Sequence, residues 1–337
     1  MFQNVLVATD GTARSRAVLS PLPRLVDREA GRVTVVEVAE PLPTFPAQAV
    51  RPPRDAPAGG AGRELADALR AGAMENVRAV QAALAMAGLA RVETAVLDGK
   101  PGEMLVAHAR ERAVDLVAMG THGRSGLARS VLGSVADHVL RQLRGVPLLL
   151  VRPTPEQERS LELPDWPSTL AGNAGAFRRV LVPLDGSANS MSAVDPAILA
   201  SDPTATRLDL LAVVDQLPPG ARAAEPGGPG EGPAAEDAEE SLTVREARPA
   251  YERARAELER ARARMHAAGI QHVEIGVREN TFAEREIVQV ARSSGAEIVV
   301  MATHGRSGIA RGLVGSVADH LLRNLEGMPL IVIRPTD

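Results

Sequence analysis

The sequence predicts an α/β protein of two tandem domains, each an open five-stranded parallel sheet with helices on both faces. Short apolar runs alternate with longer amphipathic segments along the chain, and the whole pattern occurs twice. The 337 residues fit two domains of about 150 residues each. Because 45% of the residues are hydrophobic, each domain can bury a core of its own.

Five apolar runs in the first half are rich in Val and Leu and are bounded by Gly, Pro or Asp, which is typical of buried parallel strands. These runs are residues 4–8, 33–38, 92–97, 116–119 and 146–151. Between them, apolar residues recur at helical spacing. The expected helices are residues 14–26, 62–86, 102–112 and 134–143. Crossovers of this length require parallel pairing, and such sheets bind ligands beyond the carboxyl ends of their strands.

An internal repeat defines the domains. Residues 121–154 align without a gap to residues 303–336, with 23 of the 34 positions identical. The beginnings of the halves also align, residues 5–12 with 180–187. A period this long indicates a duplicated domain rather than a solenoid. The predicted parts are a first domain at 1–154, a proline-containing linker at 155–176 and a second domain at 177–337.

Two segments interrupt the alternation. Residues 41–62 are rich in proline, and residues 216–248 consist largely of Pro, Gly, Ala and Glu, so we expect both to be mobile. Each follows the second strand of its half and emerges at the ligand end, where a solvated spacer is the more common outcome and a lid the alternative. An amphipathic helix is expected next, at 249–268. Its inward residues are Leu258, Ala261 and Met265.

Composition excludes several classes of function. The absence of Cys excludes disulfides and thiolate chemistry. No apolar run approaches the roughly 18 residues of a membrane span, and no basic leader opens the chain, so we expect a cytoplasmic protein that does not bind membranes. A net charge of −4 and 2% aromatic residues argue against nucleic-acid binding. Lys100 is the one lysine and precedes a proline, which excludes a P-loop. The sequence also has no H-E-x-x-H motif and no carboxylate cluster with the spacing of a protein-held metal site.

Glycines gather where the fourth strand ends. Gly120 and Gly123 lie at this turn, and Gly133 with Ser134 opens the last helix. Without Cβ atoms, loop N–H groups can converge on a phosphate, which a helix N-terminus also favours. Ser134 can either cap the helix or donate its hydroxyl to a phosphate. Asp10, just past the first strand, could accept hydrogen bonds from ribose hydroxyls. These residues describe a nucleotide pocket without a lysine; the alternative is that the glycines serve the turns alone.

The spacing Gly120-x₂-Gly123-x₉-Gly133-Ser134, with Asp10 after the first strand, resembles the ATP-binding pattern of the universal stress protein family. The similarity covers both halves of the chain. It implies a Rossmann-like fold of the adenine-nucleotide alpha-hydrolase-like kind. It also implies ATP, ADP or AMP as the ligand, with Mg²⁺ arriving on the phosphates.

The resemblance implies a role for individual residues in each half. An aspartate after the first strand would meet the ribose and nearby phosphates, at Asp10 and Asp185. A valine at the end of the second strand would bind adenine through its backbone, at Val38 and Val213. The implied phosphate contacts are Gly120, Gly123, Gly133 and Ser134 in the first half and Gly305, Gly315 and Ser316 in the second.

One position departs from this pattern. Ala302 stands where the first glycine of the second half would be. We expect its methyl group either to crowd the ribose or to resist a glycine-type φ, which would weaken binding at the second site without abolishing it. The loop after the fourth strand of each half also contains a histidine and an arginine. Their side chains either contact phosphate or ribose or are solvated. These residues are His122, Arg124, His304 and Arg306.

The last strand of each half is an apolar edge. The resemblance implies that the domains pair through these strands, residues 147–151 and 329–333. Pairing two apolar edges also removes an aggregation hazard, which is a physical reason independent of the family. We therefore expect an intramolecular pseudo-dimer, and a further homodimer of chains is compatible with it.

Three functions fit these observations. The favoured one is a nucleotide-dependent regulator of a stress response that an unknown protein partner recognises. The second is an enzyme that slowly hydrolyses ATP or transfers a nucleotidyl group, and the third is an interaction module with vestigial pockets. An enzyme would need a nucleophile, base or metal carboxylate beside the phosphates, and beyond Asp10 and His122 the sequence offers none.

Overall fold

The computed structural model describes residues 1–40, 60–121, 132–170, 175–214, 242–303 and 315–336. The first half has five strands in chain order: β1 (Asn4–Ala8), β2 (Arg32–Ala39), β3 (Arg91–Asp98), β4 (Leu116–Gly120) and β5 (Leu148–Val151). Its helices are α1 (Ala13–Arg16), the 3₁₀ turn η1 (Ala17–Leu19), α2 (Leu22–Leu25), α3 (Gly60–Met86), α4 (Pro101–Glu111) and α5 (Ser134–Gln142). Two helical segments follow between the halves, α6 (Pro155–Glu162) and η2 (Trp166–Leu170).

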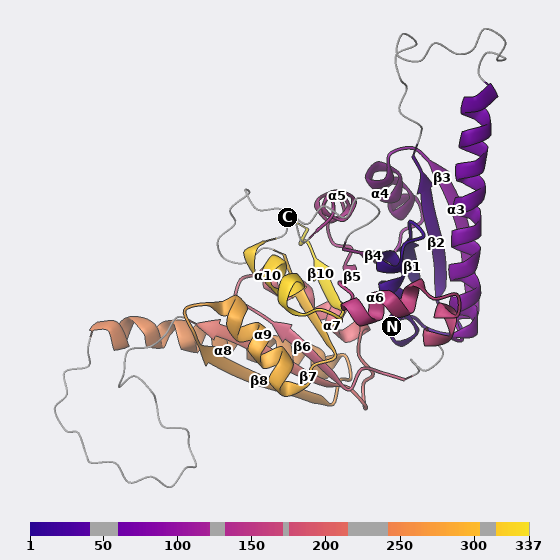
Figure 1. Cartoon of the computed structure of the whole chain (residues 1–337). Coiled ribbons are helices and arrows are strands. Elements are labelled where there is room, and N and C mark those ends of the chain that lie inside the picture. The colour runs from indigo at the N-terminus through magenta and orange to yellow at the C-terminus, as the bar shows by residue number, and fades with distance from the viewer. Residues whose placement is uncertain (41–59, 122–131, 171–174, 215–241, 304–314, 337) are drawn as a thin grey trace, which may run out of the picture.

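The second half repeats this order. Its strands are β6 (Arg179–Pro183), β7 (Arg207–Val214), β8 (His272–Glu279), β9 (Ile298–Ala302) and β10 (Leu330–Ile333). Its helices are η3 (Ser190–Ala193), α7 (Val194–Leu199), α8 (Leu242–Ala267), α9 (Ala283–Ser294) and α10 (Ser316–Asn324). Figure 1 shows the two halves side by side, the first in indigo and magenta and the second in orange and yellow.

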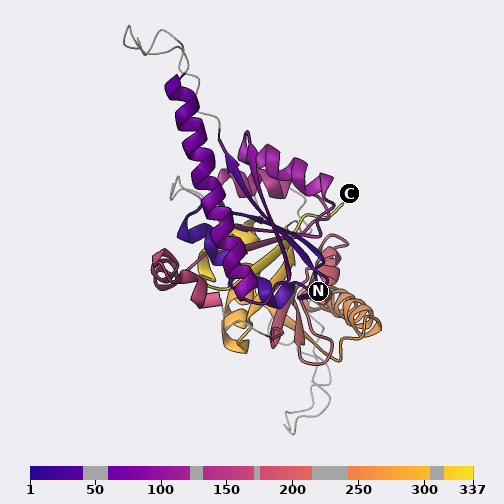
Figure 2. The same ribbon diagram turned by 90° about the vertical axis from the view of Figure 1, so that its right-hand side faces the viewer.

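Within the described residues, all strands join one ten-stranded sheet in the order β3-β2-β1-β4-β5-β10-β9-β6-β7-β8. Each half contributes five strands in the same relative order, and every pairing within a half is parallel. The predicted fold class, two five-stranded parallel sheets with helices, is confirmed. The parallel crossovers place helices on both faces, and in Figure 2 the long helix α3 runs along one face and projects beyond the sheet.

The two halves meet through an antiparallel pair, β5 with β10. Leu150 lies opposite Leu330, and Leu148 lies opposite Val332. All residues of both strands are buried, so either strand alone would leave an apolar edge exposed to water. The predicted intramolecular pairing of the last strands is confirmed.

This continuous sheet separates two hydrophobic cores, each of which spans both halves. Alternate residues of β5 enter opposite cores, Leu149 the one that includes residues of α3 and α8, and Leu148 the one that includes residues of α4, α5, α9 and α10. The three inward residues predicted for α8, Leu258, Ala261 and Met265, are fully buried in the first core.

The structure corrects two expected boundaries and shows a helix within the predicted linker. The helix expected at 14–26 is divided into α1, η1 and α2, because prolines at 21 and 23 lack the N–H that a helix requires. The predicted linker contains α6, whose start is fixed by reciprocal bonds between Thr154 and Gln157 (2.9 and 3.2 Å). Helix α8 begins at Leu242, so residues 242–248 belong to a helix and not to the expected mobile insert. Residues 41–59 and 215–241 lie outside the described part of the chain.

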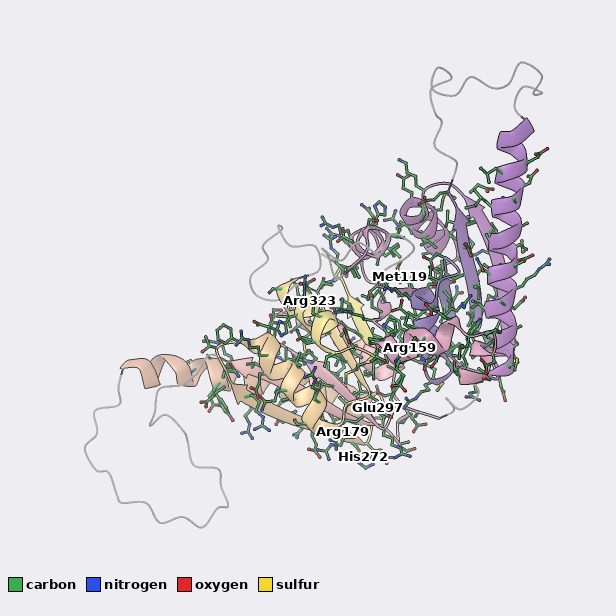
Figure 3. The ribbon with its side chains drawn as sticks, in the orientation of Figure 1. Met119, Arg159, Arg179, His272, Glu297 and Arg323 are labelled. Carbon is green, nitrogen blue, oxygen red and sulfur yellow. The ribbon has the colours of Figure 1, made fainter. Side chains whose placement is uncertain are left out.

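Side chains of the first half also hold the linker and the second half. Arg16 on α1 lies over the ring of Trp166 in η2, with the guanidinium 4.8 Å from the ring centre. Arg24 on α2 donates to Glu297 (2.9 Å) and lies 3.9 Å from the ring centre of Phe177, both at the start of the second half's sheet. Glu297 is labelled in Figure 3. The halves are therefore joined at the linker as well as at β5 and β10.

Among the described helices, none has both the length and the apolar character that a membrane crossing requires.

Candidate functional site at the carboxyl edge of the sheet

A tight turn follows β1 and fixes the carboxylate of Asp10. Its Oδ1 accepts hydrogen bonds from the backbone N–H of Thr12 (3.0 Å) and from the Thr12 hydroxyl (2.6 Å). The Thr12 hydroxyl oxygen in turn accepts from the N–H of Ser15 (3.2 Å), which caps α1. Gly11 between them has a φ of +79°, a left-handed conformation that suits glycine. The carboxylate is therefore held by its own turn before any ligand arrives.

The second half builds the same turn after β6. Asp185 Oδ1 accepts from the N–H of Ser187 (3.0 Å) and from its hydroxyl (2.6 Å). The Ser187 oxygen accepts from the N–H of Ser190 (3.1 Å), and Gly186 also has a φ of +79°. The two predicted aspartates thus occupy equivalent, rigid positions.

The predicted adenine-binding valines lie at the same edge. The last paired residue of β1, Ala8, lies opposite Val36, so Val38 is two residues beyond the end of β1. In the second half, Pro183 lies opposite Leu211, and Val213 is again two residues beyond. Both valines are half-buried. The structure therefore places each valine past the strand that carries the aspartate.

Gly120 has a packing role that sequence reasoning did not identify. A Cβ at this position would lie 2.9 Å from the carbonyl oxygen of Arg14 and 3.1 Å from Cα of Ser15. The backbone of α1 thus occupies the space that a side chain would need. Its φ is also outside the left-handed region. In the second half Ala302 occupies the position of Gly120 and is buried, and the 3₁₀ turn η3 lies against β9 there. The expectation that Ala302 weakens nucleotide binding stays a prediction.

The predicted Gly–Ser pairs open the last helix of each half. Gly133 is the N-cap of α5, with its N–H donating to the carbonyl oxygen of Thr121 (2.6 Å), and Gly315 is the N-cap of α10. Ser134 and Ser316 are the first helical residues and are exposed. Of the two roles considered for Ser134, capping is therefore taken by Gly133. Because glycine has no capping side chain, the N-cap residue of neither helix satisfies the first-turn N–H groups, an arrangement that favours an anion at a helix start.

The backbone differs between these two helix starts. Gly133 has φ −65° and ψ 158°, which any residue can adopt. Gly315 has φ +81°, and a Cβ there would lie 2.2 Å from the carbonyl oxygen of Thr303. Only the second half therefore requires glycine at the N-cap on backbone grounds.

A chain of contacts brings the first-half residues together. Ser15 approaches the N–H of Asp10 (3.4 Å) and lies where a Cβ of Gly120 would be. Gly120 precedes Thr121, whose carbonyl binds the N–H of Gly133. The aspartate turn, the end of β4 and the start of α5 thus form one continuous edge, near Met119 as labelled in Figure 3.

Sequence reasoning missed the residues that support the aspartate turns. Thr12 and Ser15 have counterparts in Ser187 and Ser190, and the shared spacing Asp-Gly-Thr/Ser-x-x-Ser was the signal that could have identified them. Asn76 of α3 was also missed. It fills the space beside Gly11, where a Cβ would lie 2.3 Å from its Nδ2, and this nitrogen is 3.4 Å from Oε1 of the buried Glu37.

The electrostatics of the first turn include one nearby cation. Burial lowers the pKa of Arg16, and the carboxylate of Asp10 opposes that shift.

Six of the predicted contact residues lie outside the described part of the chain. They are His122, Gly123, Arg124, His304, Gly305 and Arg306. Within the described part, no three His, Asp or Glu side chains form a group that could hold a metal ion.

Comparison with known proteins gives a consistent result. The model of the universal stress protein family matches the chain twice, at residues 1–152 and 176–334. Universal stress protein MJ0531 of Methanocaldococcus jannaschii is 26% identical over 159 residues, which cover 46% of this chain and 86% of that protein. A Thermus aquaticus universal stress protein, named for the QAH/OAS sulfhydrylase 3′ region, is 29% identical over 152 residues, covering 45% of this chain and all (100%) of that protein.

A solved structure matches the whole chain rather than one half. It is a universal stress protein from Archaeoglobus fulgidus, which is 19% identical and has a TM-score of 0.63. The match covers 99% of this chain and 97% of that one. At this identity the similarity concerns the fold alone.

Proposed function

Since the chain belongs to the universal stress protein family, we propose that it is a cytoplasmic regulator that binds an adenine nucleotide, with ATP as the first candidate, and not a fast enzyme. A protein partner would recognise the nucleotide-bound state. The observation that carries this proposal is the repetition of one arrangement in both halves. Each half has an aspartate fixed in a turn at the carboxyl edge of its sheet and a last helix that begins with a Gly–Ser pair without a side-chain cap.

The residues at this edge fit a nucleotide phosphate. In α5 the first helical hydrogen bond runs from the N–H of Asp137 to the carbonyl of Gly133 (2.9 Å), and in α10 from Asp319 to Gly315 (3.1 Å). The N–H groups of the residues between them have no helical acceptor. Together with the partial positive charge of a helix start, they can bind a phosphate without a lysine.

The same chemistry favours binding over catalysis. Neutral backbone donors hold the ground state of a phosphate about as well as its transition state, and only the difference between the two accelerates a reaction. If ATP binds with Mg²⁺, the ion would be held mainly by the phosphates, since the described residues include no metal-binding group of three acids or histidines. ATP would then stabilise the folded protein and turn over slowly.

Substitutions at the helix start give a direct test. Gly133→Asp introduces a favourable N-cap at a φ and ψ that suit it, and it places a negative charge on the proposed phosphate position. Gly133→Asn is the matched control, because it caps the helix without the charge. We expect ATP affinity in the first half to fall moderately in the Asn variant and by more than tenfold in the Asp variant, with the melting temperature unchanged or raised.

Isothermal titration on the full chain with ATP, compared with thermal unfolding, measures both effects. Unchanged ATP binding by a stable Gly133→Asp variant would show that this helix start does not receive the phosphates. Equal losses in the Asn and Asp variants would show that the charge of the ligand is not what this position recognises.

A further inference from the structure

Strands β3 and β8 form the two outer edges of the ten-stranded sheet, and among the described residues each is paired on one side only. Figure 1 shows β8 at the outer margin of the second half, and His272 at its start is labelled in Figure 3. An edge strand presents backbone N–H and C=O groups that can pair with another chain, so proteins protect it with charges, bulges or a covering element. The two edges of this sheet differ in that protection.

The carboxylates of β3 are bound within their own chain. Glu93 lies 3.8 Å from guanidinium nitrogens of both Arg32 and Arg112, and Asp98 pairs with Arg70. The charged side chains of this edge are therefore occupied by neighbouring elements of the first half.

The charged side chains of β8 are less occupied. Arg207 of β7 binds Oε2 of Glu274, and within the described residues Oε1 has no partner. Arg278 is exposed and has neither a hydrogen-bond nor an ion-pair partner in the described part of the chain. This edge thus offers one carboxylate oxygen and one guanidinium group to a further strand.

Gly276 lies in the middle of β8 and is required there neither by the backbone nor by packing. Its φ is outside the left-handed region, and the pairing of β8 with β7 runs past it without a bulge. A Cβ at this position would meet no described atom within 4 Å. Glycine weakens the interior of a strand, and where no bulge or bend requires it, it is typical of a site that another backbone approaches closely.

The sequence around Gly276 is complementary to itself. A two-fold axis perpendicular to the sheet pairs two copies of β8 antiparallel, and an axis at Gly276 places this glycine opposite its own copy. Ile275 then lies opposite Val277 of the second copy, and Glu274 lies opposite Arg278 of the second copy. An axis at either neighbouring residue separates Glu274 from Arg278 and leaves both charges without an opposite charge.

The two faces of such a pair would both match. Glu274, Gly276 and Arg278 share one face, because successive side chains of a strand alternate. On the other face Ile275 and Val277 are half-buried and pack against the core that includes residues of α8. Pairing would cover their exposed sides and continue this core into the second copy, as β5 and β10 already do between the halves.

Strand β3 has no comparable register. It carries one arginine, Arg91, and two acids, Glu93 and Asp98. A two-fold axis at any of residues 93–96 leaves no acid opposite the arginine, and an axis at Glu93 itself would place two glutamates together. Charge complementarity therefore distinguishes β8 from the other edge.

We propose that two copies of this chain associate through β8, paired antiparallel about a two-fold axis at Gly276, so that the sheet continues from one copy into the other. The partner is a second copy because the matches of Glu274 with Arg278 and of Ile275 with Val277 need the same sequence on both sides. Backbone hydrogen bonds supply affinity, and the two symmetric charge pairs fix the register. The proposal does not depend on nucleotide binding.

Sedimentation of the full chain over a range of concentrations measures this association, and we expect a dimer that dissociates on dilution. Arg278→Glu replaces two attractive pairs with two repulsive ones and should raise the Kd of the dimer by at least about tenfold. Because Arg278 has no partner among the described residues, the melting temperature of the monomer should not change. Arg91→Glu makes the same charge change at the exposed start of β3 and is the matched control, with the Kd expected to change less than about twofold.

Gly276 gives a sharper test, because a residue on the two-fold axis meets its own copy. In Gly276→Lys and Gly276→Glu the new side chain points into open space within a single chain, so both variants should fold. Each alone should be a monomer, since two like charges face each other in the pair. An equimolar mixture of the two variants should form a mixed dimer, because the introduced charges are then opposite.

Three results would overturn the proposal. The first is a wild-type chain that stays monomeric at roughly 0.1 mM, where even a weak specific pair is populated. The second is a dimer that persists in Arg278→Glu, or that is lost equally in Arg91→Glu. The third is a mixture of Gly276→Lys and Gly276→Glu that remains monomeric, because that outcome excludes the register centred on Gly276.

Discussion

Gly120→Ala tests whether this glycine is required by packing or by a ligand. The added Cβ would lie 2.9 Å from the carbonyl oxygen of Arg14 and 3.1 Å from Cα of Ser15. Both are backbone atoms of α1, which has to move as a unit to make room. Overpacking of this kind costs about 2 kcal/mol. For an unfolding unit of about 150–250 residues, that corresponds to a fall of about 4–8 °C in the melting temperature.

Thermal and urea unfolding of the full chain measure this loss. Gly72→Ala is the matched control, because Gly72 lies within α3 and a Cβ there meets no atom within 4 Å. It should stabilise the protein by about 0.5–1 kcal/mol through helix propensity. If Gly120→Ala left the stability unchanged but weakened ATP binding, the packing explanation would be wrong, and the glycine would be required by the ligand instead.

Three further predictions concern stability. Gly315→Ala combines a φ of +81° with a Cβ placed 2.2 Å from the Thr303 carbonyl, so it should cost about 3 kcal/mol in denaturant unfolding; a loss below about 1 kcal/mol would contradict it. Burial lowers the pKa of His108. As the pH drops below about 6.5, the unfolded chain therefore binds a proton at this histidine more readily than the folded chain does, and the free energy of unfolding falls. His108→Leu should flatten that part of the pH–stability profile, and an unaltered profile would exclude this histidine as its cause. Arg24→Ala removes the bond to Glu297 (2.9 Å) and the contact with the Phe177 ring (3.9 Å), and should lower the free energy of unfolding by about 1–2 kcal/mol; no change would mean that this contact does not join the halves.

The strands were predictable from sequence because each is a short apolar run that ends at a polar or turn residue. Residues 4–8 were expected and observed as β1, and the internal repeat indicated the second copy of every element. Helix boundaries were harder to predict. The capping pair of Thr154 and Gln157 could be read from the sequence and still lay within a segment interpreted as a linker, while the proline at 249 suggested a helix start where α8 already continues.

The positions of the candidate site residues were predictable only as far as local sequence determines them. Asp10 and the Gly–Ser pair of α5 follow from turn and helix-start chemistry, which short segments carry themselves. The role of Gly120 depends on the backbone of α1 across the sheet edge, which no local pattern specifies.

The most direct test of a nucleotide-binding regulator is one titration of the full chain with ATP, in which bound nucleotide, melting temperature and phosphate release with and without Mg²⁺ are measured together. Two equivalents of bound ATP, a raised melting temperature and a release rate far below the roughly 10 s⁻¹ of a median enzyme are the predicted results. Release near that ordinary rate, lost in Asp10→Ala or His122→Ala, would contradict the regulator and favour an enzyme. The absence of both binding and a thermal shift would contradict nucleotide recognition altogether.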